Sequence, residues 1–326
     1  MAFVAFINVD YHTWGRLSGI GYVAAIVLLA VVLALPDSFA VNGAKRWLAL
    51  GPVRFQVSDY ARLALIVLIA SRCQDAGEDL RQAGPFIKIL GKALVLCALI
   101  LFEPNFSTAA LLAVLALAML YVAGARFWHV AGVVVAAVPV AAAGLLAAPY
   151  RRERLLAYLG TSRHAEAAGY QAQQALIGLG NGGLFGVGLG QGRQKYFYLP
   201  EPHTDFAFSI LGEEIGFVGL VLVLLVFAWI VYRGFRIALH APDRLGQVMA
   251  FGVTLMLALH VLVHAAVNVG LAPTTGVPLP LLSYGGVSIV LTMISFGILL
   301  NISSQAGRQF PGATRAPGER LKRLQA

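Results

Sequence analysis

The sequence contains few charged residues and almost no cysteine. Of its 326 residues, 12% are Asp, Glu, Lys or Arg, about half the share that soluble domains carry. So few polar side chains cannot cover a soluble globular protein, and the abundance of apolar residues also excludes intrinsic disorder. The two cysteines, Cys73 and Cys97, fall at the end of one apolar run and inside another, which is not the pattern of a disulfide framework.

Apolar residues make up 59% of the chain, and they gather in eight long segments. A helix needs about 20 residues to cross a bilayer, and backbone groups in lipid must bond within their own segment. We therefore expect an all-α, polytopic transmembrane helical bundle of about eight spans, a single membrane domain over residues 1–326. The segments run near Leu17–Leu35, Tyr60–Cys73, Phe86–Phe102, Thr108–Ala123, Phe127–Pro149, Phe217–Tyr232, Gly246–Val269 and Gly285–Ser303.

The formal net charge is +9, which in a soluble chain would suggest a nucleic-acid partner. Here most basic residues lie between apolar runs, where they orient helices or meet lipid head groups, so we expect membrane lipids and no nucleic acid as partners. The larger share falls on the face that also holds the N-terminus, which predicts a cytoplasmic N-terminus. Residues 150–206 then form a large extracytoplasmic loop, and residues 305–326 a flexible basic cytoplasmic tail.

The stretch Asn42–Arg62 concentrates positive charge between two apolar segments. It is either a loop with interfacial anchors or a site for an anionic head group. Asp59 and Arg62 are three positions apart, so a helix that begins near Ser58 would place them on one face as a pair. The four cations of this stretch are Lys45, Arg46, Arg54 and Arg62.

The stretch Ala175–Pro200 contains a run of glycines that ends at Gly192, and the cations Arg193 and Lys195 follow that run directly. Glycines let backbone N–H groups approach an anion, but they are also typical of a hinge. No G-K-[ST] sequence ends the run, so a nucleotide-binding P-loop is not supported.

The stretch Leu199–Gly216 places five ionisable groups at the start of an apolar segment. Charged groups at membrane depth are costly and indicate a functional site. Asp205 is followed by Phe-Ala-Phe, so partial desolvation would raise its pKa and make it a base; the alternative is that Asp205 caps a helix. We expect Glu213 and Glu214 to pair with cations or polar helix faces rather than to react. The five groups are Glu201, His203, Asp205, Glu213 and Glu214.

The stretch Asn268–Ser288 holds three prolines and four glycines between two apolar segments. This composition predicts a broken or re-entrant segment that lines a cavity. Just upstream, His260 and His264 have the i, i+4 spacing of a metal pair, but no HExxH glutamate accompanies them, which favours interhelical hydrogen bonding.

Together these four stretches resemble the SEDS family, the RodA/FtsW/SpoVE proteins of bacterial shape, division and sporulation. NGAKRW and FQVSDYAR are similar to the family's NGARRW and FQPSE-x-x-K, with Asp59 and Arg62 in place of Glu and Lys. GNGGLFGVGLGQGRQK, LPEPHTDF, LGEEIGFVG and PTTGVPLPLLSYGG match almost residue for residue. Asn105 stands where the family's P-D-x-G-T motif has an acid, which favours an FtsW-like member over a RodA-like one.

The resemblance implies an all-helical bundle, usually of ten spans, in the bacterial cytoplasmic (inner) membrane. Such a protein polymerises lipid II into glycan strands at the outer face during division or elongation, together with a class B penicillin-binding protein. A divalent cation, Mg²⁺ or Mn²⁺, is expected to help, although no cluster of ligands in the sequence identifies its site. The chain begins near what resembles the end of the family's second helix, so we expect the first helix and most of the second to be absent.

The resemblance also assigns roles to residues. The family's essential aspartate lies in the HTDF motif, which makes Asp205 the predicted catalytic base. The predicted substrate-binding residues are Lys45, Arg46, Arg54, Asp59, Arg62, Arg193, Lys195, His203 and Thr204. The predicted supporting residues are Glu201, Glu213, Glu214, Ser283, Tyr284 and Gly285.

Two other functions fit the same residues. Broken helices and charges at membrane depth are also typical of transporters, so a lipid II flippase is the first alternative. The second is a non-catalytic scaffold that only activates the penicillin-binding partner.

Overall fold

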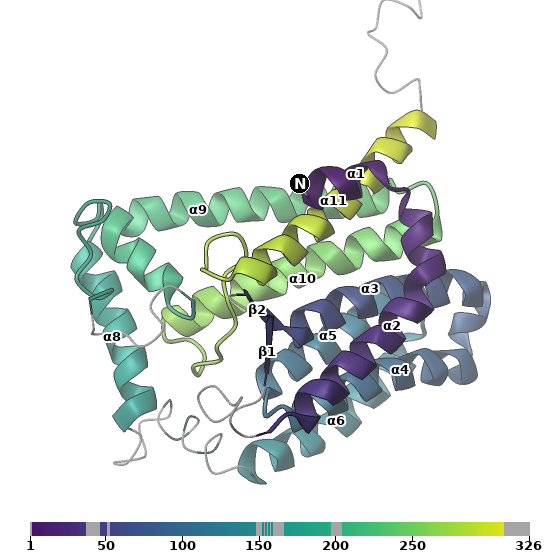
Figure 1. The fold of residues 1–326 in the computed structure, drawn as a ribbon, viewed down its shortest axis with the longest axis horizontal. Coiled ribbons are helices and arrows are strands. Elements are labelled where there is room, and N and C mark those ends of the chain that lie inside the picture. The colour runs from purple at the N-terminus through teal and green to yellow at the C-terminus, as the bar shows by residue number, and fades with distance from the viewer. Residues whose placement is uncertain are drawn as a thin grey trace, which may run out of the picture.

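The structure of the chain, a computed structural model, describes residues 2–36, 46–50, 53–147, 152, 154, 156, 158, 166–196 and 204–309. Most of the described chain is helical, and the eight predicted apolar segments each fall on one helix, which confirms the all-α membrane fold. Among the described residues, six helices are long and apolar enough to cross a membrane: α2 (Tyr11–Ala34), α4 (Ala83–Phe102), α6 (Phe127–Ala147), α9 (Ala207–Leu239), α10 (Arg244–Asn268) and α11 (Gly286–Gln309) (Figure 1). The other two are α3 (Val57–Ala76) and the shorter α5 (Phe106–Val122).

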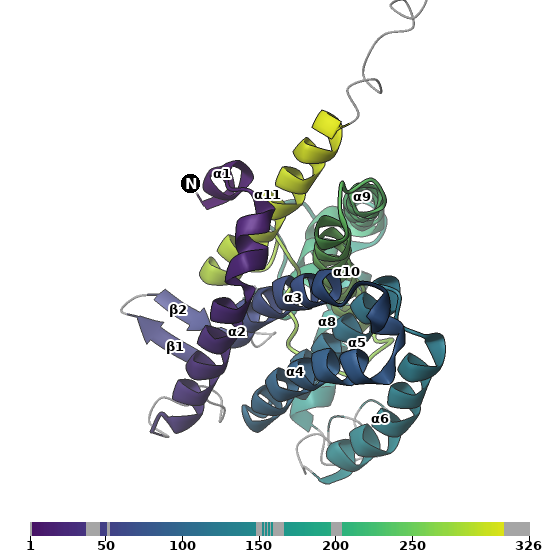
Figure 2. The same cartoon turned by 90° about the vertical axis from the view of Figure 1, so that its right-hand side faces the viewer.

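Helix α3 is the central helix of the bundle and contacts α2, α4, α5, α10 and α11 (Figure 2). Its side chains from Val57 to Ala70 are buried, with the exception of Tyr60. Helix α6, by contrast, lies at the edge, and its apolar side chains face outward, as a lipid-facing helix requires. Because neighbouring helices shield α3 from lipid, it can carry ionisable side chains at membrane depth.

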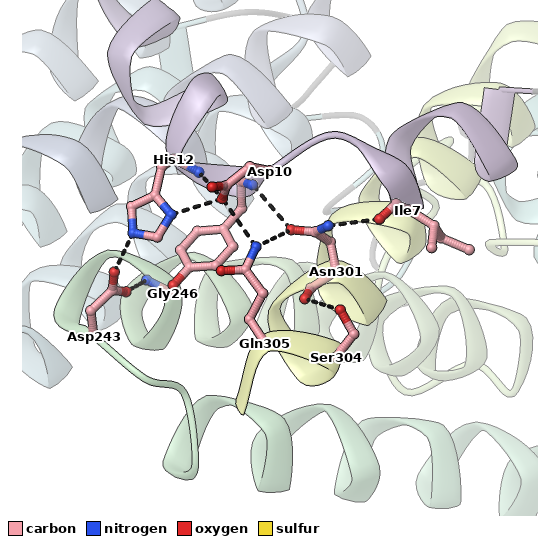
Figure 3. Close-up of polar contacts among 9 residues, drawn as sticks. Ile7, Asp10, His12, Asp243, Gly246, Asn301, Ser304 and Gln305 are labelled. Atoms are coloured by element: carbon pink, nitrogen blue, oxygen red, sulfur yellow. Dashed lines mark hydrogen bonds and ion pairs between the residues drawn. The ribbon is translucent and has the colours of Figure 1, made fainter. Parts of the chain in front are cut away.

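A short helix, α1 (Ala2–Asn8), precedes α2 and lies against α11. The carboxylate of Asp10 caps α2 by accepting a hydrogen bond from the backbone N–H of His12 at 3.0 Å. The His12 ring lies between two carboxylates, with Nδ1 2.7 Å from Asp10 Oδ1 and Nε2 2.6 Å from Asp243 Oδ2 (Figure 3). Asp243 precedes α10, so His12 joins the N-terminus to the α9–α10 turn.

Asn301 of α11 makes a second connection at this end of the bundle, which we call the N-terminal end. Its side-chain oxygen accepts from the backbone N–H of Tyr11 at 3.0 Å, and its amide donates to the carbonyl of Ile7 at 2.6 Å (Figure 3). Partial burial raises the pKa of Asp10, but hydrogen bonds from Gln305 and from His12 outweigh it and lower that pKa to about 2.

A β-hairpin lies within the stretch that the sequence analysis treated as a loop. Strand β1 (Trp47–Leu50) pairs antiparallel with β2 (Val53–Gln56), with Trp47 opposite Gln56 and Leu48 opposite Phe55. Short strands of this kind carry a weak sequence signal, because four residues cannot establish an alternation. The hairpin leads directly into α3, because β2 ends at Gln56 and α3 begins at Val57.

Two of the predicted ranges include helical residues. The predicted loop 150–206 contains a helix, α8 (Glu166–Gly182), which packs against α9 and α10. The predicted flexible tail begins too early, because α11 continues to Gln309; residues 310–326 lie outside the described residues. Asn105, the amide in place of the family's acid, caps α5 by accepting from the backbone N–H of Thr108 at 3.4 Å.

Candidate active site

Asp205 lies just ahead of the first turn of α9, whose N-cap position is the next residue, Phe206. The two carbonyl groups that flank its Cα are both hydrogen-bonded. The carbonyl of Thr204 accepts from Ser283 Oγ at 2.7 Å, and the carbonyl of Asp205 accepts from Asn268 Nδ2 at 3.3 Å. Ser283 belongs to the segment 269–285 and Asn268 ends α10, so two other parts of the chain hold the backbone at Asp205.

The segment 269–285, which joins α10 to α11, is not helical, as its prolines and glycines predicted. Gly276 has a φ of +66°, and a Cβ atom built there would lie 3.3 Å from Asp205 Oδ2. The half-buried carboxylate therefore lies against backbone that carries no side chain. Val277, the residue after Gly276, is hydrogen-bonded to α10, because its carbonyl oxygen is 2.7 Å from His264 Nδ1.

Asp59, Arg62 and His260 form a buried chain of hydrogen bonds between α3 and α10. Helix α3 begins at Val57, one residue before the predicted start, and the guanidinium Nη2 of Arg62 donates to Asp59 Oδ1. The Nη1 atom of Arg62 donates to His260 Nε2, and His260 Nδ1 is 2.8 Å from the carbonyl of Met256. The predicted ion pair and the predicted interhelical hydrogen bond are thus both confirmed, and they share one arginine.

A pocket opens beside this chain. Pro278 and Pro280 of the segment 269–285 form part of its wall, which confirms that the broken segment lines a cavity. Within the described residues, Arg62 Nε has no hydrogen-bond partner, so one donor of a buried guanidinium remains available. Since Gly276 contacts Asp205 and Pro278 lines the pocket, residues 276–280 connect the aspartate with the arginine. The polar side chains of the wall are Asp59, Arg62, His260, Ser288, Thr292 and Ser295.

Arg46 and Glu103 form a second polar group near the hairpin. Arg46 donates from Nε to the carbonyl of Glu103 at 3.1 Å and from Nη2 to the carbonyl of Pro104 at 2.7 Å. Glu103 is fully buried, and both carboxylate oxygens have no partner in the described chain. Burial raises the pKa of Glu103 to about 8, against the lowering effect of Arg46. Glu103 was not among the predicted site residues, although an acid at the end of an apolar run is a signal for one.

The predicted glycine-rich segment packs against a break in α9. The helix is interrupted at Gly216, which has a φ of 71°, and the backbone N–H of Phe217 donates to the carbonyl of Gly183 at 2.9 Å. A Cβ atom at Gly186 would lie 2.2 Å from the carbonyl oxygen of Glu214. At these positions the absent side chains admit the backbone of α9 rather than an anion.

The two glutamates of α9 hold the same segment. Glu213 is buried and accepts from the backbone N–H of Gln194 at 3.0 Å. Glu214 pairs with Lys195, as predicted, at 2.7 Å, and the Lys195 ammonium also donates to the carbonyl of Gly190 at 2.7 Å. The charge of Lys195 is therefore already compensated within the chain.

The remaining predicted residues are distributed as follows. Lys45, Glu201 and His203 lie outside the described residues, as does the side chain of Arg54. Arg193 and Tyr284 are exposed, and Gly285 directly precedes α11. The structure thus brings together Thr204, Asp205 and Ser283, and separately Asp59 and Arg62. Asn268 and His260, which contact these two groups, were not among the predicted site residues.

The predicted divalent cation finds no matching donor set in the described chain. No three His, Cys, Asp or Glu side chains of the described residues come together as metal ligands would.

Comparison with protein families gives a match over nearly the whole chain. The profile of the cell cycle proteins FtsW, RodA and SpoVE matches residues 1–308. Stage V sporulation protein E of Bacillus subtilis is 39% identical over 91% of this chain and 81% of its own length. The probable peptidoglycan glycosyltransferase FtsW of Geobacter sp. (strain M18) is 38% identical over 91% of this chain and 82% of its own length.

Solved structures have the same fold. A chain from a peptidoglycan synthase complex, described for its structural coordination of polymerization and crosslinking, superposes with a TM-score of 0.78 at 28% identity, covering 94% of this chain and 86% of that one. The rod shape determining protein RodA of Thermus thermophilus superposes with a TM-score of 0.66 at 26% identity, covering 94% and 83%.

Proposed function

Because this chain belongs to the cell cycle protein family of FtsW, RodA and SpoVE, we propose that it is a peptidoglycan glycosyltransferase that polymerises lipid II and uses Asp205 as its base. The observation that carries the proposal is the placement of the Asp205 carboxylate. It lies against Gly276, on the segment that continues into the pocket of Arg62. A carboxylate and a guanidinium that lie along the same segment can serve the two charges that a glycosyl transfer develops.

The proposed reaction is a single displacement. The 4-hydroxyl of one lipid-linked sugar attacks C1 of another, and the bond from C1 to the diphosphate oxygen breaks with inversion. The Asp205 carboxylate takes the hydroxyl proton as the new glycosidic bond forms. Undecaprenyl diphosphate leaves with the bonding electrons, so negative charge grows on the leaving group.

A cation near the leaving diphosphate would stabilise that charge. Arg62 is the best-supported candidate, because it lines the pocket, is shielded from water and retains an available Nε donor. Arg46 and Lys195 bond carbonyl groups or a glutamate of the chain, and Arg193 is exposed. Arg62 is itself paired with Asp59 through Nη2, and its Nε atom is the donor that is left for a ligand. Charge stabilisation is stronger in a poorly solvated site than at an exposed one, which again favours Arg62.

Membrane orientation and partner follow from the same assignment. The excess of basic residues on the N-terminal face supports an extracytoplasmic position for the Asp205 end at the bacterial cytoplasmic membrane, where we propose that lipid II is polymerised. The likeness to a chain of a peptidoglycan synthase complex supports a class B penicillin-binding protein as partner. In this arrangement polymerisation and crosslinking occur at one location.

The test is polymerisation of labelled lipid II by the purified protein, reconstituted with its penicillin-binding partner, with Asp205→Asn as the variant. We expect the wild type to form glycan strands and the variant to lose at least about 100-fold in rate, the contribution of a general base. Equal binding of the partner by both proteins is the control for folding.

Strand formation at the wild-type rate by Asp205→Asn would refute the assignment of the base. Transbilayer movement of lipid II without polymer would instead support the flippase. Strand synthesis by the partner that requires this chain to be present, whatever residue the chain carries at position 205, would support the scaffold.

A further inference from the structure

We infer that Asn268 is a positioning residue for Asp205, acting together with Ser283 on the two peptide groups that flank the Asp205 Cα atom. The inference rests on the proposed function, in which the Asp205 carboxylate is the base. Asn268 of α10 was not among the predicted site residues, and it does not touch the reacting atoms.

The geometry follows from which carbonyl groups are held. The peptide plane before the Asp205 Cα contains the Thr204 carbonyl, which accepts from Ser283 Oγ at 2.7 Å. The plane after it contains the Asp205 carbonyl, which accepts from Asn268 Nδ2 at 3.3 Å. Peptide groups are planar, so fixing both planes fixes φ and ψ of Asp205 and with them the direction of its Cα–Cβ bond.

Asn268 is itself held in one orientation. It is fully buried, and its second amide hydrogen bonds the carbonyl of His264 at 2.8 Å. Its oxygen accepts from the backbone N–H of Ser209 at 3.1 Å and from Ser209 Oγ at 2.8 Å. Two donors and two acceptor sites are the full capacity of an amide. If the side-chain amide of Asn268 were flipped, its hydrogens would face the Ser209 N–H, which is also a donor. The amide nitrogen therefore has to remain on the Asp205 side.

Ser283 is anchored as firmly from the other side. Its hydroxyl accepts from the backbone N–H of Leu279 at 2.8 Å while donating to Thr204. Leu279 lies in the segment 269–285 between two prolines that line the pocket, Pro278 and Pro280. The carboxylate is thus oriented by the same segment that forms the pocket wall, and by the end of α10.

This arrangement matters for a base because a displacement of about 1 Å can cost on the order of 100-fold in rate. Ser209 lies in the first turn of α9, and His264 lies one turn before Asn268 at the end of α10. No residue of this set needs to contact the substrate. A loss of positioning should therefore reduce kcat and leave KM unchanged.

The experiment measures kcat and KM for polymerisation of labelled lipid II by the full chain with its penicillin-binding partner. The variants are Asn268→Ala, the isosteric Asn268→Asp, which keeps the acceptor for Ser209 but loses both donors when ionised, and Ser283→Ala. The matched control is Asn301→Ala. Asn301 is also a buried asparagine that bonds a backbone carbonyl and a backbone N–H, but at the N-terminal end of the bundle. Elution from a sizing column and thermal melting report folding.

We expect Asn268→Ala, Asn268→Asp and Ser283→Ala each to lower kcat by about 10- to 100-fold with KM within about threefold of wild type. Asn301→Ala should keep kcat within about threefold. The double variant Asn268→Ala, Ser283→Ala should lose less than the product of the two single losses, because either change already frees the Asp205 backbone. If Asn268→Ala does not fold, Asn268→Asp and Ser283→Ala decide the question.

A folded Asn268 variant with wild-type kcat would overturn the inference, as would a loss that appears only in KM or that Asn301→Ala reproduces. The result for Asp205→Asn separates this failure from that of the proposed function. If Asp205→Asn is inactive while Asn268→Asp is fully active, only the positioning role is wrong. If Asp205→Asn is active, the base itself is wrongly assigned.

Discussion

Helix α3 carries two ion pairs of the same i, i+3 spacing, one near each end. The Asp59–Arg62 pair is buried among α3, α10 and the segment 269–285, with side chains 7% and 9% exposed. The Arg72–Asp75 pair spans 3.2 Å, and its side chains are 40% and 62% exposed. The same residue types at the same spacing thus experience two different dielectric surroundings. Breaking the buried pair should therefore cost much more stability than breaking the exposed pair, and of the two it is the buried pair that lines a pocket.

The same contrast holds for the two ends of the bundle. At the N-terminal end, His12 bridges the partly exposed carboxylates of Asp10 and Asp243 (Figure 3). At the Asp205 end, the carboxylates of Asp59 and Glu103 are buried. Burial of an ionisable side chain is costly, and its retention at depth is typical of a functional site. The N-terminal end is a structural joint, and the Asp205 end is the candidate site of chemistry.

The largest effect is expected from breaking the buried pair. Arg62→Met would leave Asp59 buried without its cation and His260 without its donor, so we expect the free energy of unfolding to fall by about 3–5 kcal/mol. Arg72→Met, the matched change at the exposed pair, should cost about 0.2–1 kcal/mol. Thermal and denaturant unfolding in detergent compares the two, and equal losses would contradict the contrast between the pairs.

A smaller and pH-dependent effect is expected at Glu103. Its pKa is raised from 4.5 to about 8, so between these values it is neutral when folded and ionised when unfolded. The unfolded chain then binds fewer protons, and the wild type loses stability as pH rises through this window. Glu103→Gln should remove that loss and exceed the wild type in stability at pH 8 by on the order of 2 kcal/mol.

Melting temperatures of both proteins from pH 4.5 to 8 test this prediction. The exposed Glu78, in the turn η2 (Gly77–Arg81) at the other end of α3, provides the control. Glu78→Gln should follow the wild-type pH dependence. A wild type whose stability does not fall over this range would show that Glu103 is ionised in the folded protein.

A third effect concerns activity rather than stability. Gly276 and Gly77 both have positive φ, of 66° and 52°, so alanine should strain the backbone at either by about 1 kcal/mol. Only at Gly276 does the new methyl group meet Asp205, 3.3 Å from Oδ2, whereas the Gly77 site has no atom within 4 Å. We expect Gly276→Ala to slow lipid II polymerisation by about 10-fold and Gly77→Ala to leave the rate within about twofold. Similar rates for the two variants would show that the contact between residue 276 and Asp205 does not affect polymerisation.

The smallest effect is expected at the N-terminal joint. His12→Gln would remove a partly exposed bridge worth about 0.2–1 kcal/mol and should leave polymerisation unchanged. The pKa of Asp10 is lowered to about 2 by its hydrogen bonds, so its contribution to stability is present above its ordinary pKa of 3.8 and lost as pH falls through about 2. In His12→Gln this acid-induced loss of melting temperature should be smaller, which a pH series of melting curves can measure.

Much of the fold was predictable because apolar length alone specifies a membrane helix. Spacing and composition predicted the eight segments, the Asp59–Arg62 pair and the broken segment after α10. They also predicted a structural pairing for Glu214, but not that its partner is Lys195. The hairpin β1–β2 and helix α8 were not, since a four-residue strand has no clear period and α8 was obscured by the glycines that follow it. The alternative prediction for Asp205 was that it caps a helix. The observed N-cap of α9 is the next residue, Phe206, and a difference of one residue is usual for helix ends.

What the sequence determined by itself is therefore the class of protein, its family and the chemical types available to it, because hydropathy and motifs are local properties of the chain. Only the tertiary structure decided which polar groups meet. Asn268 and Ser283 reach the two carbonyls that flank Asp205 from 63 and 79 residues away, and His260 reaches Arg62 across 198 residues. Such contacts depend on how helices pack, and no single stretch of sequence contains that information.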